Sequence, residues 1–138
     1  MERTTPFVRG QQLLACIEVC RGSRIKRDGR GRIDFISPLP SPFDYGSLVD
    51  AVRAPDGEGY DVLVLGPTRR RGERVTLPLL GIVDFVDAGV PDAKLVLGER
   101  FAPDDGLRID RFFWRYAQIK RLMRPHRESR YCGWLMAP

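Results

Sequence analysis

Short apolar runs separated by short, turn-rich connections constrain the fold of this chain most. The runs predict strands over 13–19, 33–36, 60–65, 75–86 and 93–97, with one or two strands in the fourth around Pro78 and Gly81. The connections are rich in Gly, Pro and Asp and are too short for the crossover helices of a parallel sheet. We therefore predict a mainly β, α+β fold built on a five- to six-stranded antiparallel barrel, closed or partly open.

Two segments are interpreted as irregular. Residues 21–32 are polar and contain several glycines, which favours a loop or a hairpin. Residues 37–46 contain three prolines, which fix the backbone and withhold amide donors, so we predict an ordered loop and no central strand there.

One main C-terminal helix is predicted after Pro103, with an aspartate capping its start and Pro125 ending it. Its apolar residues recur at helical spacing and are expected to pack on the outside of the barrel. They are Ile109, Phe112, Phe113, Tyr116, Ile119 and Met123. The 138 residues suit one domain over 1–138, in which Trp134 returns to the core.

Composition excludes several classes of site. Cys16, Cys20 and Cys132 are odd in number and lack a CxxC spacing, so we expect reduced thiols without a disulfide framework or a cysteine zinc site. The single histidine, His126, lies among arginines and is expected to be a solvated surface residue. No apolar run approaches the ~20 residues of a membrane span, and the first residues lack a secretory signal, so a cytoplasmic protein is expected.

The net charge of the chain does not identify its binding partner. The formal net charge of +5 is compatible with nucleic acid, with a phosphorylated small molecule, or with solubility alone. Clustered arginines at 69–71, which we interpret as a solvated hairpin tip, and along 121–130 support a non-catalytic module that binds nucleic acid or protein. Because most aromatic residues fall in the helix or next to prolines, nucleic acid is the less favoured partner.

Two groups of carboxylates carry the functional interpretation. Asp56, Glu58 and Asp61 lie at the start of one strand, and Asp87 and Asp92 flank the loop before another. If both loops lie at one end of the barrel, the five acids converge and require cations. All-oxygen ligands suit Mg²⁺, with Mn²⁺ as a substitute. Each group alone is also compatible with local turn capping.

The order of these residues from about Leu14 to Trp134 resembles the soluble inorganic pyrophosphatases, as a divergent, shortened member. The resemblance implies an oligonucleotide-binding-like barrel, Mg²⁺-dependent hydrolysis of pyrophosphate to two orthophosphates, and a homo-oligomer. The metal-ligand positions of the family correspond to Asp56, Glu58, Asp61, Asp87, Asp92 and Glu18. The substrate-binding positions correspond to Lys26, Lys94, Tyr45 and Tyr116, with Arg32 and Lys120 as substitutes for missing contacts. The implied catalytic residues are Glu58, which would align the attacking water, Asp61, Lys26 and Tyr45.

The departures from the family pattern fall mostly on phosphate recognition. Ser41 and Ala117 stand at a tyrosine and a lysine of the family, Ala88 at an acid, and Glu58 at an aspartate. Three functions therefore stay open. The first is a divergent pyrophosphatase, the second a repurposed enzyme of this scaffold acting on an organic diphosphate or phosphorylated metabolite in a biosynthetic pathway, and the third the non-catalytic binding module.

Overall fold

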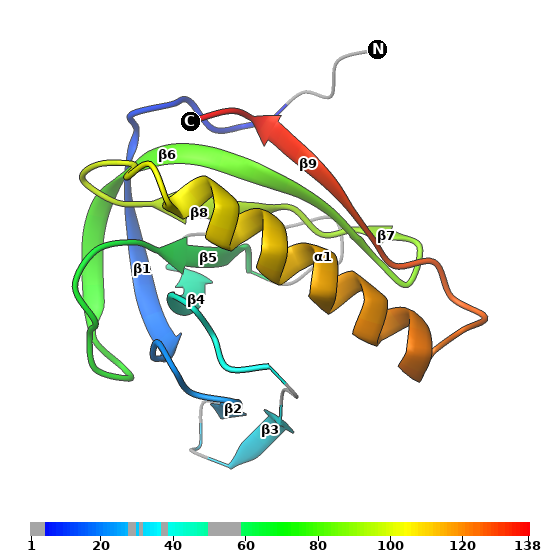
Figure 1. Cartoon of the computed structure of the whole chain (residues 1–138). Coiled ribbons are helices and arrows are strands. Elements are labelled where there is room, and N and C mark those ends of the chain that lie inside the picture. Colours follow the sequence, from blue (N-terminus) through cyan, green and yellow to red (C-terminus); the bar gives the residue numbers. More distant parts are fainter. Residues whose placement is uncertain (1–4, 28–29, 31, 37–38, 50–58) are drawn as a thin grey trace.

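The computed structural model describes residues 5–27, 30, 32–36, 39–49 and 59–138 (Figure 1). Its barrel strands are β1 (Gln12–Val19), β4 (Asp44–Leu48), β5 (Asp61–Val64), β8 (Lys94–Leu97) and β6 (Arg74–Asp87). The remaining elements are β2 (Ile25–Arg27), β3 (Ile33–Ile36), β7 (Val90–Pro91), α1 (Asp105–Met123) and β9 (Arg130–Met136).

The five barrel strands close in the order β1-β4-β5-β8-β6, with β6 pairing back onto β1. This confirms the predicted barrel. One pair differs from the antiparallel expectation, because β5 and β8 run parallel in the register Asp61↔Lys94. The chain leaves β5, passes along β6 and returns as β8 between β5 and β6, so the start of β8 lies beside the start of β5.

β6 is one continuous 14-residue strand. It pairs with β1 over its first part and with β8 and β9 over its second, and the register with β8 shifts between Leu79 and Gly81. A Cβ at Gly81 would lie 2.8 Å from the Met136 carbonyl oxygen, so glycine is what lets β9 pack this closely against β6. Pro78 and Gly81 therefore mark a change of partners inside a single strand.

β4 corrects the loop predicted over 37–46, because its first three residues form a central strand between β1 and β5. The three prolines of that segment all precede Asp44, and the hydrogen-bonded ladder begins once they have passed. Of the loop or hairpin predicted over 21–32, residues 25–27 form β2, which pairs with β3, the strand predicted at 33–36. β7 and β9, both paired with β6, were not predicted as strands.

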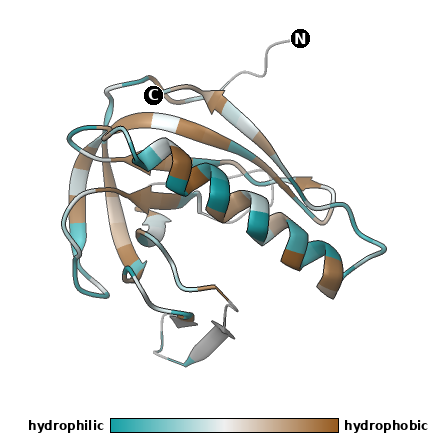
Figure 2. Cartoon of the chain, in the orientation of Figure 1, coloured by the Kyte–Doolittle hydropathy of each residue, from teal (hydrophilic) through white to brown (hydrophobic). Residues whose placement is uncertain are grey.

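Two apolar clusters explain the nearly continuous apolar runs of β5 and β8, which are buried on both faces. Val62, Val64, Leu95 and Leu97 belong to one cluster with residues of β1 and the first half of β6. Alternate residues of the same two strands pack under α1 with Ile109, Phe113 and Ala117. Figure 2 shows apolar residues continuing along the strands, whereas α1 carries alternating hydrophilic and hydrophobic bands.

The predicted packing of the helix outside the barrel is confirmed, and Trp134 joins the cluster beneath it. His126 is exposed, as predicted. None of the described residues belongs to a helix with both the length and the apolar character needed to cross a bilayer.

The start of α1 differs from the prediction that an aspartate caps the free amides of the helix. Asp104 occupies the N-cap position without a side-chain capping hydrogen bond. Asp105 instead accepts a hydrogen bond from the Ala102 amide at 2.7 Å, while its own amide donates to the Ala102 carbonyl at 3.1 Å. This reciprocal pair satisfies an amide just ahead of the helix.

We expect Asp105→Ala to lower the free energy of unfolding by about 1 kcal/mol, because that amide loses its charged acceptor. Asp104→Ala should change it by less than about 0.5 kcal/mol. Urea denaturation followed by circular dichroism measures both values. A larger loss for the Asp104 variant than for the Asp105 variant would contradict this assignment.

Candidate functional site

A buried lysine joins two carboxylates where β5 and β8 begin side by side. Lys94 Nζ donates to Asp61 Oδ2 at 2.5 Å and to Asp92 Oδ2 at 2.7 Å. Asp61 is the register partner of Lys94, and Asp92 lies two residues before Lys94, so the alternation of an extended chain turns both side chains toward the same region. Two of the five acids that were expected to converge, Asp61 and Asp92, thus share one lysine.

The lysine is enclosed, whereas its two partners reach solvent. The Lys94 side chain is 7% exposed, compared with 27% for Asp61 and 18% for Asp92. Lys94 Nζ also lies 5.9 Å from the ring centroids of both Tyr45 and Phe85, at the distance of cation–π contacts. The site is therefore a carboxylate pair with one face toward water and an aromatic wall behind the ammonium.

Burial and charge shift the pKa of each group in this site. Burial alone would lower the pKa of the Lys94 ammonium, but Tyr45, Asp61 and Asp92 together raise that pKa well above its ordinary value. Burial raises the pKa of the Asp92 carboxyl, an effect that Lys94 opposes. Burial also raises the pKa of the Tyr45 phenol well above its ordinary value, so Tyr45 is neutral and able to donate a hydrogen bond at neutral pH.

A second ion pair joins α1 to the end of β6. Lys120 Nζ of α1 donates to Asp87 Oδ2 at 3.0 Å and lies 5.2 Å from the Tyr116 ring centroid. Burial would lower the pKa of Lys120, but Tyr116 and the hydrogen bond to Asp87 raise it above its ordinary value. Tyr116 packs edge-on against the Phe85 ring, the same ring that Lys94 faces. The two ion pairs thus flank one aromatic side chain.

β6 and β7 form a hairpin with a two-residue turn, which places Asp87 and Asp92 on its two arms. Ala88 and Gly89, at the turn between β6 and β7, have φ of 52° and 86°, as in the primed turns that suit hairpins. Asp87 pairs with Val90, and the Asp92 amide donates to the Phe85 carbonyl at 2.8 Å. Ser129 Oγ accepts from the Ala88 amide at 3.0 Å and lies 3.5 Å from Asp87 Oδ1.

Full convergence of the five predicted acids is not seen in the part of the chain that the structure describes. No group of three or more His, Cys, Asp or Glu side chains able to hold a metal ion occurs among the described residues. Asp61 and Asp92 meet, whereas Asp87 pairs with Lys120. Asp56 and Glu58 lie outside the described residues.

The remaining predicted site residues lie on β1 and on the separate β2–β3 hairpin, and some are described only in part. Lys26 belongs to β2, but its side chain is outside the description. Glu18 is half-buried on β1, and Arg32 is exposed just ahead of β3. These three residues keep the roles that the resemblance implies only as predictions.

Comparison with solved structures gives several inorganic pyrophosphatases that share this fold. The enzyme from Coxiella burnetii superposes with a TM-score of 0.72 at 22% identity, covering 95% of this chain and 89% of its own. The enzyme from Neisseria gonorrhoeae gives a TM-score of 0.73 at 21% identity, over 91% of this chain and 82% of its own. The chain has the inorganic pyrophosphatase fold. The match extends to the Thermus thermophilus enzyme, with a TM-score of 0.69 at 20% identity over 96% of this chain and 87% of that enzyme.

By sequence, neither a protein-family profile nor a curated protein matches this chain. Its likeness to the inorganic pyrophosphatase fold therefore rests on backbone architecture.

Within this pyrophosphatase fold, two positions that differ from the family pattern, Ser41 and Ala117, bear on phosphate binding. Ser41 is buried, and its hydroxyl donates to the Phe43 carbonyl. Ala117 lies on the buried face of α1, packed against the barrel. Neither position presents a group that could bind a phosphate, whereas Lys120, one helical turn beyond Ala117, does present an ammonium.

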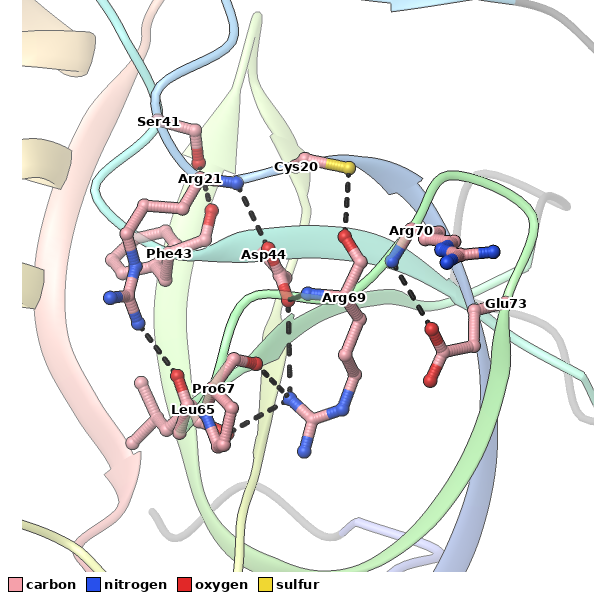
Figure 3. Close-up of polar contacts among 11 residues, drawn as sticks. Cys20, Arg21, Ser41, Phe43, Asp44, Leu65, Pro67, Arg69, Arg70 and Glu73 are labelled. Atoms are coloured by element: carbon pink, nitrogen blue, oxygen red, sulfur yellow. Dashed lines mark hydrogen bonds and ion pairs between the residues drawn. The ribbon is translucent and has the colours of Figure 1, made fainter.

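A second buried polar centre, around Asp44, was missed by the sequence interpretation (Figure 3). Asp44 is 1% exposed and accepts hydrogen bonds from the Arg21 amide at 2.9 Å and the Arg69 amide at 2.8 Å. Arg69 also donates through Nη1 to the Pro67 carbonyl at 2.9 Å, so its guanidinium folds back onto its own loop. The prediction of a solvated hairpin tip was therefore wrong for Arg69, although Arg70 and Arg71 are exposed.

Proposed function

We propose that this chain is a divergent, Mg²⁺-dependent hydrolase of the inorganic pyrophosphatase type, which converts pyrophosphate to two orthophosphates. One observation carries the proposal: on a pyrophosphatase fold, Lys94 is buried against Asp61 and Asp92 beside the Tyr45 ring. Carboxylates able to hold a cation and an ammonium able to neutralise phosphate are thereby placed within one hydrogen-bonded group. This combination suits an anhydride joining two phosphoryl groups.

The donor set fits a hard divalent cation. Asp61 and Asp92 supply carboxylate oxygens, have solvent on one side, and already share one cationic partner. We assign metal binding to these two acids together with Asp56, Glu58, Asp87 and Glu18, with Mg²⁺ as the ion and Mn²⁺ as its substitute. When bound, Mg²⁺ supplies Lewis-acid charge that neutralises phosphate oxygens and makes water a better nucleophile.

The chain's own residues bind and orient the substrate. Lys94 and Lys120 supply ammonium donors, and Tyr45 and Tyr116 supply phenol donors, to phosphate oxygens on either side of the Phe85 ring. Lys26 and Arg32 add positive charge from the β2–β3 hairpin. Glu58 aligns the attacking water, and Asp61 and Tyr45 complete the catalytic set with Lys26.

The proposal is tested by measuring phosphate release from pyrophosphate with Mg²⁺ and with a chelator, for the wild type and for Asp61→Asn. We expect activity that requires Mg²⁺ and falls by about 100-fold or more in the variant, because the loss of an anionic ligand weakens binding of the cation that neutralises the phosphate charge. Asp104→Asn removes the same charge from the start of α1 and should leave activity unchanged. Release that survives the chelator or the Asp61→Asn substitution would contradict the proposal.

A second candidate function is favoured by the chemistry at Ser41 and Ala117. Both positions lack a phosphate-binding group on the site, so recognition of the second phosphate is reduced relative to the metal-binding half. A substrate that carries an organic group on one phosphate, such as an organic diphosphate of a biosynthetic pathway, suits such a site. Turnover of organic diphosphates, with no release from pyrophosphate, would select this alternative.

The remaining features of the proposal concern the setting of the protein. We propose that residues 1–138 act as one domain and form a homo-oligomer. The proposed location is cytoplasmic, with pyrophosphate or an organic diphosphate as the partner, and neither nucleic acid nor a membrane is required.

A further inference from the structure

Lys94 does more at this site than a phosphate-binding lysine requires. Its ammonium donates to both carboxylates that the proposed function assigns to the metal, at 2.5 Å from Asp61 and 2.7 Å from Asp92. It is also less exposed than either of them. A lysine held in this way neutralises the carboxylate pair from its buried side, while both acids keep a side toward water.

Neutralisation of this kind follows from the packing around the site. Two carboxylates that share a partly buried region repel one another unless a cation lies between or beside them. Among the described residues, Lys94 is the cation that contacts both acids. Its backbone is held in the β8 ladder, its side chain is buried, and its ammonium lies 5.9 Å from the Tyr45 and Phe85 ring centroids. The protein therefore contains its own cation at this position.

We propose that Lys94 is a resident counter-ion that competes with the divalent metal for Asp61 and Asp92. Metal loading then breaks the two Lys94 hydrogen bonds and releases the ammonium toward phosphate, so that metal binding and substrate binding are coupled through one side chain. This inference rests on the proposed function only in taking Asp61 and Asp92 as metal ligands.

The proposed competition predicts that removal of the Lys94 charge strengthens metal binding. Lys94→Met removes the charge but keeps a straight apolar side chain, and calorimetric titration with Mn²⁺ in the absence of substrate measures the affinity. We expect Mn²⁺ to bind the variant about tenfold more tightly or better, because the cation no longer displaces an ammonium from the same oxygens. Lys94→Arg keeps the charge and should bind no more tightly than the wild type.

A matched control separates local competition from overall charge. Arg74→Met removes one positive charge at the far end of β6, away from Val83, which pairs with Lys94. Its Mn²⁺ affinity should stay within about twofold of the wild type. Weaker or unchanged Mn²⁺ binding by Lys94→Met, or a gain of equal size in Arg74→Met, would overturn the proposal.

A second test uses only the wild-type protein and therefore does not depend on whether a variant folds. Lys26, Lys94 and Lys120 are the three lysines of the chain, so acetylation at each can be followed by peptide mass spectrometry. Lys94 should be protected in metal-free protein and should be acetylated several-fold faster at saturating Mg²⁺. No increase on metal addition would contradict its release.

Asp61→Asn and Asp92→Asn distinguish failure of this inference from failure of the proposed function. Loss of Mn²⁺ binding in both variants supports the metal site, and tighter binding by Lys94→Met in addition supports the competition. If wild-type protein binds neither Mn²⁺ nor Mg²⁺, both proposals fail. If metal binding depends on Asp61 and Asp92 but Lys94 affects neither affinity nor acetylation, only the competition fails.

Discussion

Gly46→Ala is expected to lower the free energy of unfolding by about 3 kcal/mol or more. A Cβ at this position would lie 1.9 Å from the Cys16 carbonyl oxygen, 2.8 Å from its carbonyl carbon and 3.1 Å from Ile17 Cα. These are backbone atoms of β1, which pairs with Gly46 across the ladder. A side-chain rotation cannot relieve the overlap, so the variant must separate β1 from β4 and open the barrel.

Urea denaturation followed by tryptophan fluorescence measures this loss. Gly106→Ala is the matched control, because a Cβ there lies at 3.6 Å from the Phe101 ring, which is an ordinary contact, and Gly106 is in the first turn of α1. The control should stabilise the protein by roughly 0.5–1 kcal/mol through helix propensity and a less flexible unfolded chain. Equal stabilities for the two variants would show that β1 and β4 are not held this closely.

The barrel was predictable from the sequence because apolar runs and turn residues report directly on strands. The sequence interpretation was wrong at β4, because the three prolines of 37–46 were taken to exclude a strand from the residues that follow them as well. Proline restricts itself and the residue before it, so Asp44, two residues after Pro42, is free to enter a ladder. β9 was missed because most of its side chains are half-buried and its apolar residues do not alternate clearly with polar ones.

The centre of the site was also predictable, for a different reason. Asp61, Asp92 and Lys94 adjoin strands recognisable from their apolar runs, and charged residues at such positions need partners. The sequence did not indicate that Lys94 would contact Asp61 as well as Asp92, because the contact with Asp61 depends on the parallel pairing of β5 with β8. Strand direction is set by the path of β6 and is not encoded in any local pattern.

Asp44 shows the limit of local patterns most clearly. An aspartate after a proline-rich segment is typical of a turn, yet this one is 1% exposed and belongs to a central strand. Its two oxygens accept from the Arg21 amide and the Arg69 amide, which follow β1 and β5 respectively. It therefore links the ends of both strands that flank β4, and the connection appears only once the barrel is closed.

Asp44→Ala is accordingly expected to lower the free energy of unfolding by about 3 kcal/mol, because two backbone amides lose a charged acceptor. The Arg69 Nη1 group, 3.9 Å from Asp44 Oδ2, loses its ion-pair partner as well. Asp44→Asn keeps one acceptor oxygen but turns an NH₂ group toward the other amide. We therefore expect Asp44→Asn to lower the free energy of unfolding, but by less than Asp44→Ala does.

Urea denaturation at neutral pH compares these variants with Asp104→Ala, which removes an exposed aspartate without a side-chain cap hydrogen bond. The expected order of stability is wild type and Asp104→Ala together, then Asp44→Asn, then Asp44→Ala. Because Tyr45 follows Asp44 on β4 and its side chain points to the opposite face, loosening of this strand start should also displace the ring beside Lys94. An Asp44→Ala protein as stable as Asp104→Ala would mean that water replaces the carboxylate at both amides, and that the start of β4 is held by its ladder alone.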